Sequence, residues 1–168
     1  MAYTSTPKIG EPIFEVKNWH VFDAVHADKE KIRGIDMHVR KGEVVGIAGL
    51  MGAGRTELAM SIFGRAYGQN ISGEVRMHGK PVDVSTIQKA MQNGIAYVTE
   101  DRKNYGLVLI DDIKHNVTLA NLPGVAKNGV IDDGHELAVA SRYRKELNIR
   151  CSSVFQQTVN LSGGNQQK

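Results

Sequence analysis

Apolar and polar residues alternate along one short stretch of the chain, and two other stretches also predict strands. In "GIDMHVRKGE" (34–43), Ile35, Met37 and Val39 alternate with polar side chains, the period of two that is typical of a half-buried strand. The stretch "IFEVKNW" (13–19) also predicts a strand, and "GEVRMHGK" (73–80) predicts another that ends in a glycine turn. We expect the strands at 34–43 and 73–80 to expose one face to solvent.

Two runs are apolar without alternation. They are "EVVGIAGL" (43–50) and "IAYV" (95–98), and each is short enough for a single strand. Continuous apolar runs of this length are typical of strands that are covered on both faces, as in a parallel sheet. We therefore expect both segments to be buried strands.

Helical patterns lie between and after these strands. "TELAMSIFG" (56–64) predicts a helix that its final glycine ends, and "STIQKAMQNG" (85–94) predicts a second one. In the second, Ser85 and Gln88 have the spacing of a capping box, and Gly94 follows the last turn.

The chain becomes mostly helical from Asp111 onward. "DDGHELAVASRYRKELNI" (132–149) opens with Asp133 and Glu136 at the spacing of a helix cap. Apolar residues then recur on roughly one helical face, at Leu137, Ala140 and Leu147.

A glycine-rich loop joins the first apolar run to the first helix. Phosphate-binding loops follow the pattern G-x-x-x-x-G-K-[ST], and here Gly49, Gly54 and Thr56 match while Arg55 replaces the lysine. A glycine loop between a strand and a helix presents backbone N–H groups to an anion. The candidate phosphate-binding residues are Gly49, Leu50, Met51, Gly52, Ala53, Gly54, Arg55, Thr56 and Glu57.

Composition narrows the class of protein without identifying it. The 168 residues carry 21 basic and 18 acidic side chains, a formal charge of +3, with no basic block that would indicate nucleic acid. A single cysteine, Cys151, excludes an intramolecular disulfide or a cysteine-based metal cluster. The apolar runs are too short to span a bilayer, and the N-terminus lacks the apolar core of a signal peptide. These features predict a protein of the cytoplasm.

The last eight residues, "LSGGNQQK" (161–168), resemble the signature sequence of ATP-binding cassette (ABC) ATPases, whose usual form is LSGGQ. A phosphate loop upstream of this signature is a specific combination. "GEVVGIAGLMGAGRTEL", "YVTEDRK" and "NLSGGNQQK" are similar to the second cassette of the ATP-binding subunits of ribose, galactose and xylose importers, where arginine typically replaces the loop lysine. The resemblance covers residues 12–168.

This resemblance implies an α/β fold: a P-loop NTPase core with an antiparallel β-subdomain and a helical subdomain, whose C-terminal core strands are missing from these residues. Residues 1–12 are then a flexible tail, 13–168 a partial nucleotide-binding domain, and about 106–160 the helical subdomain that contacts the membrane permease. Neighbours of the missing strands are expected to expose apolar faces and unpaired edges.

The same resemblance assigns roles to single residues. Glu100 stands where the family has the Q-loop glutamine that contacts Mg²⁺ and the attacking water, and Thr56 is expected to bind Mg²⁺ beside ATP. The signature residues are Leu161, Ser162, Gly163, Gly164 and Asn165, with Asn165 in place of glutamine. They would contact ATP held by an opposite cassette, because family cassettes pair head to tail. Trp19 and Phe22 are weak candidates for stacking on adenine, and core packing suits them better.

The implied function is sugar import driven by ATP and Mg²⁺, at the cytoplasmic face of the membrane. The partners are a second cassette, a permease and, indirectly, a periplasmic sugar-binding protein, with no nucleic acid. Because the Mg²⁺-binding aspartate and the general-base glutamate are absent, the isolated chain is expected to be inactive. Two alternatives stay open: a different phosphate-loop enzyme such as a GTPase or small-molecule kinase, and a non-catalytic nucleotide-binding or interaction module.

Overall fold

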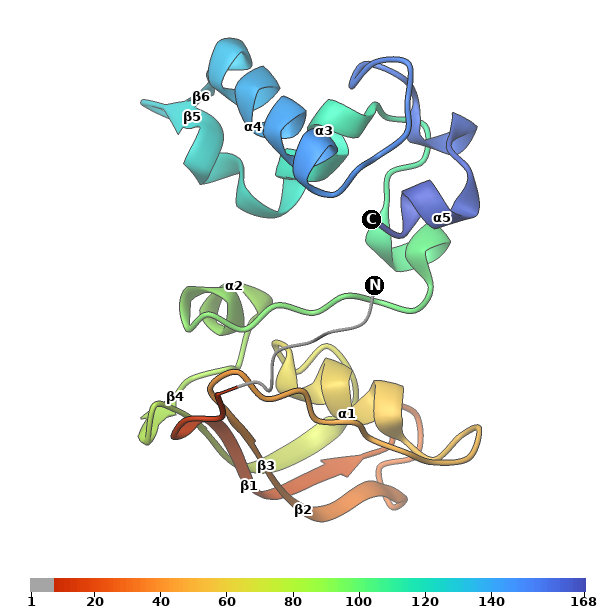
Figure 1. Ribbon diagram of the computed structural model, residues 1–168. Coiled ribbons are helices and arrows are strands. Elements are labelled where there is room, and N and C mark those ends of the chain that lie inside the picture. Colours follow the sequence, from red (N-terminus) through yellow and green to blue (C-terminus); the bar gives the residue numbers. More distant parts are fainter. Residues whose placement is uncertain (1–7) are drawn as a thin grey trace. The chain divides into compact units, whose positions relative to one another are not determined.

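The computed structural model describes residues 8–168 and separates into two compact units, which divide between Tyr97 and Val98 (Figure 1). Most of the predicted N-terminal tail, residues 1–7, lies outside the described residues. Residues 10 and 11 of this tail are bonded to Lys41. The backbone N–H of Gly10 donates a hydrogen bond to the carbonyl of Lys41, and the backbone N–H of Lys41 donates one to the carbonyl of Glu11, both at 3.0 Å.

Unit 1 is built on a four-stranded antiparallel sheet with the order β2-β1-β3-β4 (Figure 1). The three strands predicted at 13–19, 34–43 and 73–80 are confirmed. The strands are β1 (Pro12–Phe22), β2 (Glu30–Arg40), β3 (Gln69–Met77) and β4 (Lys80–Val82).

One face of this sheet forms the core of unit 1. Val16, Trp19 and Val21 of β1 are almost fully buried, and they cluster with Leu58 and Ile62 of α1 (Arg55–Ile62). These two α1 residues are four apart and so lie on one helical face. Burial of this apolar surface is the main contribution to the stability of the unit.

Trp19 is a core residue, as its sequence context favoured. Its indole Nε1 donates a hydrogen bond of 2.9 Å to Ser61 Oγ, which in turn donates to the carbonyl of Leu58. The indole is 1% exposed, so it cannot stack on a nucleotide base. Phe22 is half-buried at the end of β1.

The two predicted helices of unit 1 are confirmed, with one cap corrected. A glycine with positive φ follows each, Gly64 after α1 and Gly94 after α2 (Ile87–Gln92). The predicted capping box at Ser85 is wrong, because Thr86 is the N-cap of α2 and accepts a hydrogen bond of 3.2 Å from the backbone N–H of Lys89. Adjacent hydroxyl residues offer the same cap chemistry, and the backbone selects the second.

The prediction of two buried strands is wrong for both segments. Residues 43–50 form neither strand nor helix, and Val44 is 96% exposed. Residues 95–98 are also irregular, although Tyr97 packs its ring 5.8 Å from that of Phe63. A strand covered on both faces needs neighbours on its edges and faces. Among the described residues no strand pairs with either segment.

Unit 2 is mostly helical, as predicted from Asp111 onward. It contains a π-helical turn and a helical pair, then a small hairpin, a long helix and two terminal turns. These elements are η1 (Arg102–Gly106), α3 (Ile113–Thr118), η2 (Leu119–Val125), β5 (Ala126–Lys127), β6 (Val130–Ile131), α4 (Asp133–Glu146), η3 (Thr158–Asn160) and α5 (Gly163–Gln166).

A buried ion pair joins α3 to α4. Lys114 and Glu136 have side chains that are 8% and 3% exposed, and the Lys114 ammonium donates to the Glu136 carboxylate. Thr118 donates a second hydrogen bond of 2.8 Å to that carboxylate. Glu136 is therefore no part of a helix cap, and the N-cap of α4 is Asp132 rather than Asp133.

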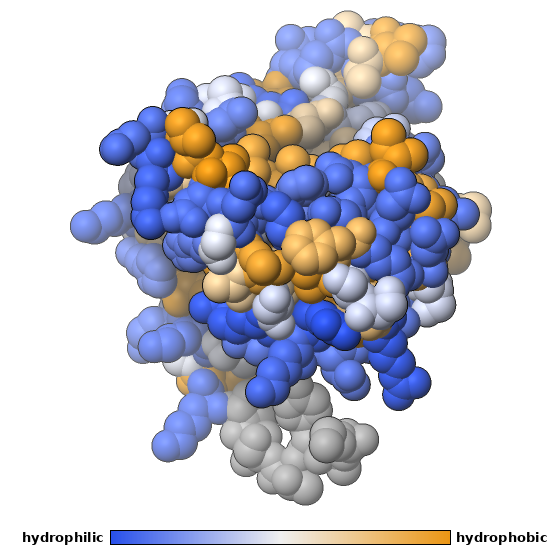
Figure 2. All heavy atoms as spheres, turned by 90° about the horizontal axis from the view of Figure 1, so that it is seen from above, coloured by the Kyte–Doolittle hydropathy of each residue, from blue (hydrophilic) through white to orange (hydrophobic). Residues whose placement is uncertain are grey.

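The predicted apolar face of α4 is confirmed at its centre only. Ala140 is fully buried and Leu137 is half-buried, whereas Leu147 is 44% exposed at the C-cap. Apolar side chains are also exposed elsewhere, and Figure 2 shows them in separate patches among polar ones on the face seen from above. Among the residues that the structure describes, no helix has the length and apolar composition needed to cross a membrane.

Candidate nucleotide-binding segments

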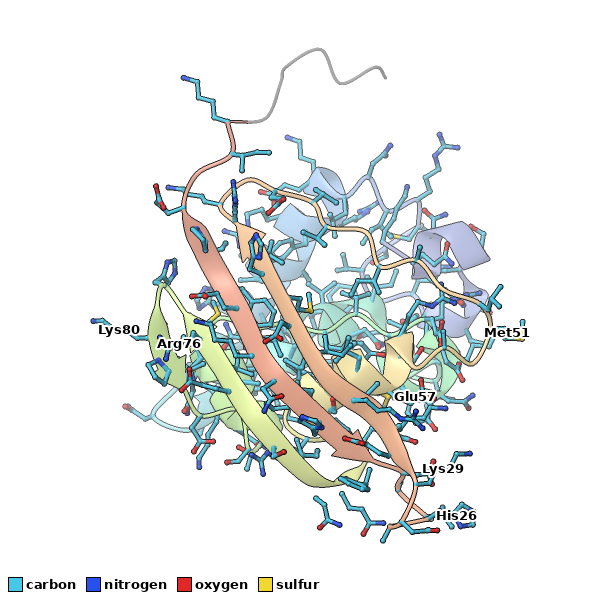
Figure 3. The ribbon with its side chains drawn as sticks, turned by 90° about the horizontal axis from the view of Figure 1, so that it is seen from below. His26, Lys29, Met51, Glu57, Arg76 and Lys80 are labelled. Atoms are coloured by element: carbon cyan, nitrogen blue, oxygen red, sulfur yellow. The ribbon has the colours of Figure 1, made fainter. Side chains whose placement is uncertain are left out.

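The glycine loop closes tightly before α1. The backbone N–H of Ala53 donates to the carbonyl of Leu50 at 3.0 Å, and a Cβ on Gly49 would lie 2.9 Å from the Cβ of Ala53. Position 49 therefore requires glycine for this close approach. Met51 at the tip of the loop is 99% exposed and points away from the chain (Figure 3).

Gly54 places the start of α1 against the sheet. It is buried, its φ is +89°, and a Cβ there would lie 3.1 Å from Ile32 Cδ1 of β2. Both the positive φ and the packing exclude a larger residue without strain. The second glycine of the phosphate-loop pattern is therefore required by the local backbone and packing.

The first turn of α1 carries charged groups of both signs. Glu57 forms an ion pair of 3.0 Å with Lys31 of β2, and Figure 3 shows Glu57 beside the strand. Burial acts to raise the pKa of Glu57, but its own backbone N–H and Lys31 outweigh this effect and hold the pKa below its usual value. The hydrogen bond with Glu57 raises the pKa of Lys31.

The helix start can accept an anion only in part. Gly54 provides no side-chain cap at the start of α1, and the backbone N–H of Glu57 is bonded to the carboxylate of the same residue. The Arg55 side chain is exposed and runs beside Gly49. The geometry thus combines a helix N-terminus with a cation, the arrangement that suits phosphate.

Glu100 lies on an exposed bend that leads into η1. The next residue, Asp101, is the N-cap of that turn and accepts hydrogen bonds from the backbone and side chain of Asn104, at 3.2 and 2.7 Å. These bonds hold the pKa of Asp101 below its usual range, the side-chain bond having the larger effect. The turn that carries Glu100 is therefore fixed by its neighbours.

The signature segment lies at the N-terminus of the short helix α5. Ser162 is the exposed N-cap residue, and Gly163 and Gly164 are also exposed. Ser162 Oγ accepts a hydrogen bond of 3.0 Å from Asn165 Nδ2, while Asn165 Oδ1 accepts one of 3.0 Å from the backbone of Arg150. Asn165 thus orients the serine.

Two residues that no sequence pattern indicated, Arg102 and Gln166, hold this segment. Arg102 donates a hydrogen bond of 3.1 Å from Nε to Gln166 Oε1, across 64 positions of the chain. No local sequence pattern indicates a side-chain contact between residues so far apart in the chain. The remaining signature residue, Leu161, is half-buried and lines a cavity of about 570 Å³ within unit 2, together with Val139 and Tyr143 of α4.

The structure therefore brings the candidate residues together in two sets. Residues 49–57 form one loop and helix start in unit 1. Glu100 and residues 161–165 belong to unit 2, where Arg102 connects their two segments.

Several curated proteins are similar to this chain. The L-arabinose transport ATP-binding protein AraG of Geobacillus stearothermophilus is 55% identical over 97% of this chain and 32% of its own length. The xylose import ATP-binding protein XylG of Thermoanaerobacter pseudethanolicus is 45% identical over 95% of this chain and 31% of its own length. The ribose import ATP-binding protein RbsA 3 of Rubrobacter xylanophilus is 48% identical over 83% of this chain and 27% of its own length. The chain spans 27–32% of the length of these relatives.

The fold is similar to that of a solved structure, cbiO1 from Clostridium perfringens, which is part of the ABC transporter complex cbiONQ. The TM-score is 0.66 at 20% sequence identity, and the match covers 94% of this chain and 58% of that one. This likeness confirms the predicted α/β cassette fold. The family model described as ABC transporter matches residues 32–168, and the chain therefore belongs to the ABC transporter family.

Proposed function

We propose that this chain is part of an ATP-binding subunit that couples ATP binding and hydrolysis to monosaccharide import. The observation that carries the proposal is the ordered pair of motifs, a phosphate loop at the start of α1 and a signature at the start of α5. The names of the similar proteins support sugar as the cargo, since they specify arabinose, xylose and ribose.

In this proposal, residues 49–57 hold the phosphates of ATP. The backbone N–H groups at the start of α1 would bind the phosphate oxygens, and the Thr56 hydroxyl would bind Mg²⁺. Bound Mg²⁺ neutralises part of the phosphate charge. Glu100 stands at the position of the family's Q-loop glutamine, and its carboxylate oxygens are of the kind that Mg²⁺ binds. These groups fit Mg-ATP. The backbone N–H groups donate hydrogen bonds to anions, and the hydroxyl and carboxylate oxygens are hard ligands of the kind that Mg²⁺ prefers.

Arg55 is the residue that sets this loop apart. A lysine ammonium is a compact charge, whereas the guanidinium is a wide planar fork. We infer that Arg55 keeps the positive charge but positions the γ-phosphate poorly, so that this loop serves the less catalytic of two sites.

The signature then serves the other site. In a head-to-tail pair of cassettes, Ser162, Gly163 and Gly164 would contact the γ-phosphate that the partner cassette holds. All three are exposed, as such a contact requires. The remaining partners are a permease, which the helical subdomain at about 106–160 would touch, and indirectly a periplasmic sugar-binding protein. The complex would lie at the inner face of the cell membrane.

A second candidate is a non-catalytic module that binds nucleotide or a partner cassette without turnover. The exposure of residues 43–50, which precede the phosphate loop, favours it for the isolated chain. The isolated chain is expected to be inactive under both functions, so the test adds a cassette with a lysine in its loop. ATPase activity that appears only then supports the proposed subunit, and no activity supports the module.

Uptake by the complete transporter tests the proposal. The test uses membrane vesicles that contain the full-length subunit, its permease and its binding protein. They are expected to accumulate labelled arabinose, xylose or ribose when Mg-ATP is supplied on the side of the membrane that carries the ATP-binding subunit. The same vesicles with Mg-ADP are the control. Equal uptake with both nucleotides, or uptake of none of the three sugars, would contradict the proposed function.

A further inference from the structure

The contact between Arg102 and Gln166 is built from oriented groups on both sides. Gln166 Nε2 donates to the carbonyl oxygens of Thr158 and Leu161, at 3.1 and 3.3 Å. Because these two bonds use the amide nitrogen, its oxygen is left to face Arg102 Nε. The side-chain amide therefore has one orientation, and it ties Arg102 to the backbone at both ends of the turn that precedes α5.

The Arg102 guanidinium also lies over the first residue of α5. A Cβ at Gly163 would be only 3.1 Å from Arg102 Nη2. Any side chain at position 163 would push the guanidinium away. The glycine at this place in the signature is thus matched to Arg102, in addition to any close approach that a ligand needs.

Both ends of this connection are anchored. On the signature side, Thr158 is 2% exposed, and its Oγ1 accepts a hydrogen bond of 3.0 Å from Asn116 of α3. On the other side, the carbonyl of Arg102 accepts a hydrogen bond of 2.8 Å from Leu107, which closes η1. Arg102 is therefore a link between two ordered segments.

We propose that Arg102 is a positioning residue for Ser162. It fixes the direction of α5 through Gln166 and Gly163, and α5 fixes Ser162, whose carbonyl accepts the backbone N–H groups of Asn165 and Gln166 at 2.9 and 3.0 Å. Because Arg102 follows Glu100 by two residues, a displacement of the Glu100 turn would also move the signature. This inference rests on the proposed function, since it assumes that Ser162 contacts nucleotide.

Steady-state ATP hydrolysis by the full-length subunit with its permease and partner cassette tests this role. We expect Arg102→Met to lower kcat about tenfold while KM for ATP stays within about twofold, because the signature acts mainly on the transition state. Arg102→Lys should be as slow as Arg102→Met, since lysine keeps the charge but not the Nε donor. Lys103→Met, at the exposed neighbouring position, is the matched control with unchanged kcat.

A double-mutant cycle separates positioning from general structural damage. Gln166→Leu should also lower kcat, because it removes this hydrogen bond and the two that Gln166 Nε2 donates. The double variant should be no slower than the slower of the two single variants, because the bond between residues 102 and 166 is already lost in each. Additive losses, a kcat restored by lysine at position 102, or wild-type kcat in Arg102→Met would each overturn the inference. If Arg102→Met does not fold, Gln166→Leu alone decides, and a wild-type kcat in that variant overturns it.

The two proposals fail in different ways. A wild-type complex without ATPase activity contradicts the proposed function. An active wild-type complex that tolerates Arg102→Met contradicts only the role of Arg102.

Discussion

Replacing Ser162 by arginine is expected to abolish ATP hydrolysis by the complete transporter, whereas Arg55→Ala is expected to leave much of it. Ser162 is exposed at the start of α5, so a long cation there would block the contact with the γ-phosphate of the partner cassette. Removal of one oriented donor to a developing negative charge typically slows catalysis about 100- to 1,000-fold. Phosphate release measured at saturating Mg-ATP gives the ranking.

The control for this comparison is an arginine at an exposed serine in unit 1, Ser72→Arg on β3, which should keep normal activity. The side chain of Ser162 makes one hydrogen bond, from Asn165, so the substitution removes little that holds the fold. If Arg55→Ala proves more damaging than Ser162→Arg, the assignment of the two motifs to different sites is wrong.

The second large effect is expected at the buried ion pair between α3 and α4. Glu136→Leu leaves the Lys114 ammonium in a buried place without its carboxylate. Breaking a buried pair by removing one partner typically costs about 3–5 kcal/mol of unfolding free energy. Denaturant unfolding of the wild-type and variant chains measures the loss.

Two further variants show whether the unpaired charge is the cause. The double change Lys114→Met with Glu136→Leu should recover most of the loss, because no buried charge remains. Glu146→Ala, which breaks the exposed pair with Arg142 at 3.9 Å, should cost less than about 1 kcal/mol. A Glu136→Leu chain as stable as the wild type would contradict the role of the pair.

The same pair should make stability depend on pH. Burial acts to raise the pKa of Glu136, but Lys114 and Thr118 outweigh it, and the pKa is lower than usual in the folded state. Its contribution is therefore present above the unfolded carboxyl pKa of about 4.3 and is lost as pH falls through the lower folded value. The hydrogen bond with Glu136 raises the pKa of Lys114, so the contribution of Lys114 disappears only in strong alkali.

Local sequence patterns predicted the strands of the antiparallel sheet and the helices that end at a glycine. The alternation of Ile35, Met37 and Val39 predicted β2, and the glycines after α1 and α2 marked their ends. The N-caps of α2 and α4 each lie one residue from the position that the sequence predicts. At both, two neighbouring residues can cap, Ser85 or Thr86 and Asp132 or Asp133, and only the backbone distinguishes them.

Long-range features could not be predicted from pattern. Residues 43–50 have the composition of a covered strand, but composition does not provide the neighbouring strand, and their side chains are exposed. The spacing of Glu136 from Asp133 predicts a cap residue, whereas its partner in the structure is Lys114, 22 positions away, and no local pattern connects the two. Likewise, nothing local in the sequence connects Arg102 with Gln166. The motifs at 49–56 and 161–165 were visible since each is contiguous in the chain.

The central claim is that residues 49–57 bind the phosphates of ATP, and thermal unfolding of the 168-residue chain with and without Mg-ATP tests it most directly. Nucleotide at about one hundred times its dissociation constant should add about 2.7 kcal/mol of stability and move a cooperative transition upward. The shift should vanish in Gly54→Val, because a side chain at φ +89° and 3.1 Å from Ile32 would displace the loop. A cooperative transition that stays at the same temperature in saturating Mg-ATP would contradict the claim.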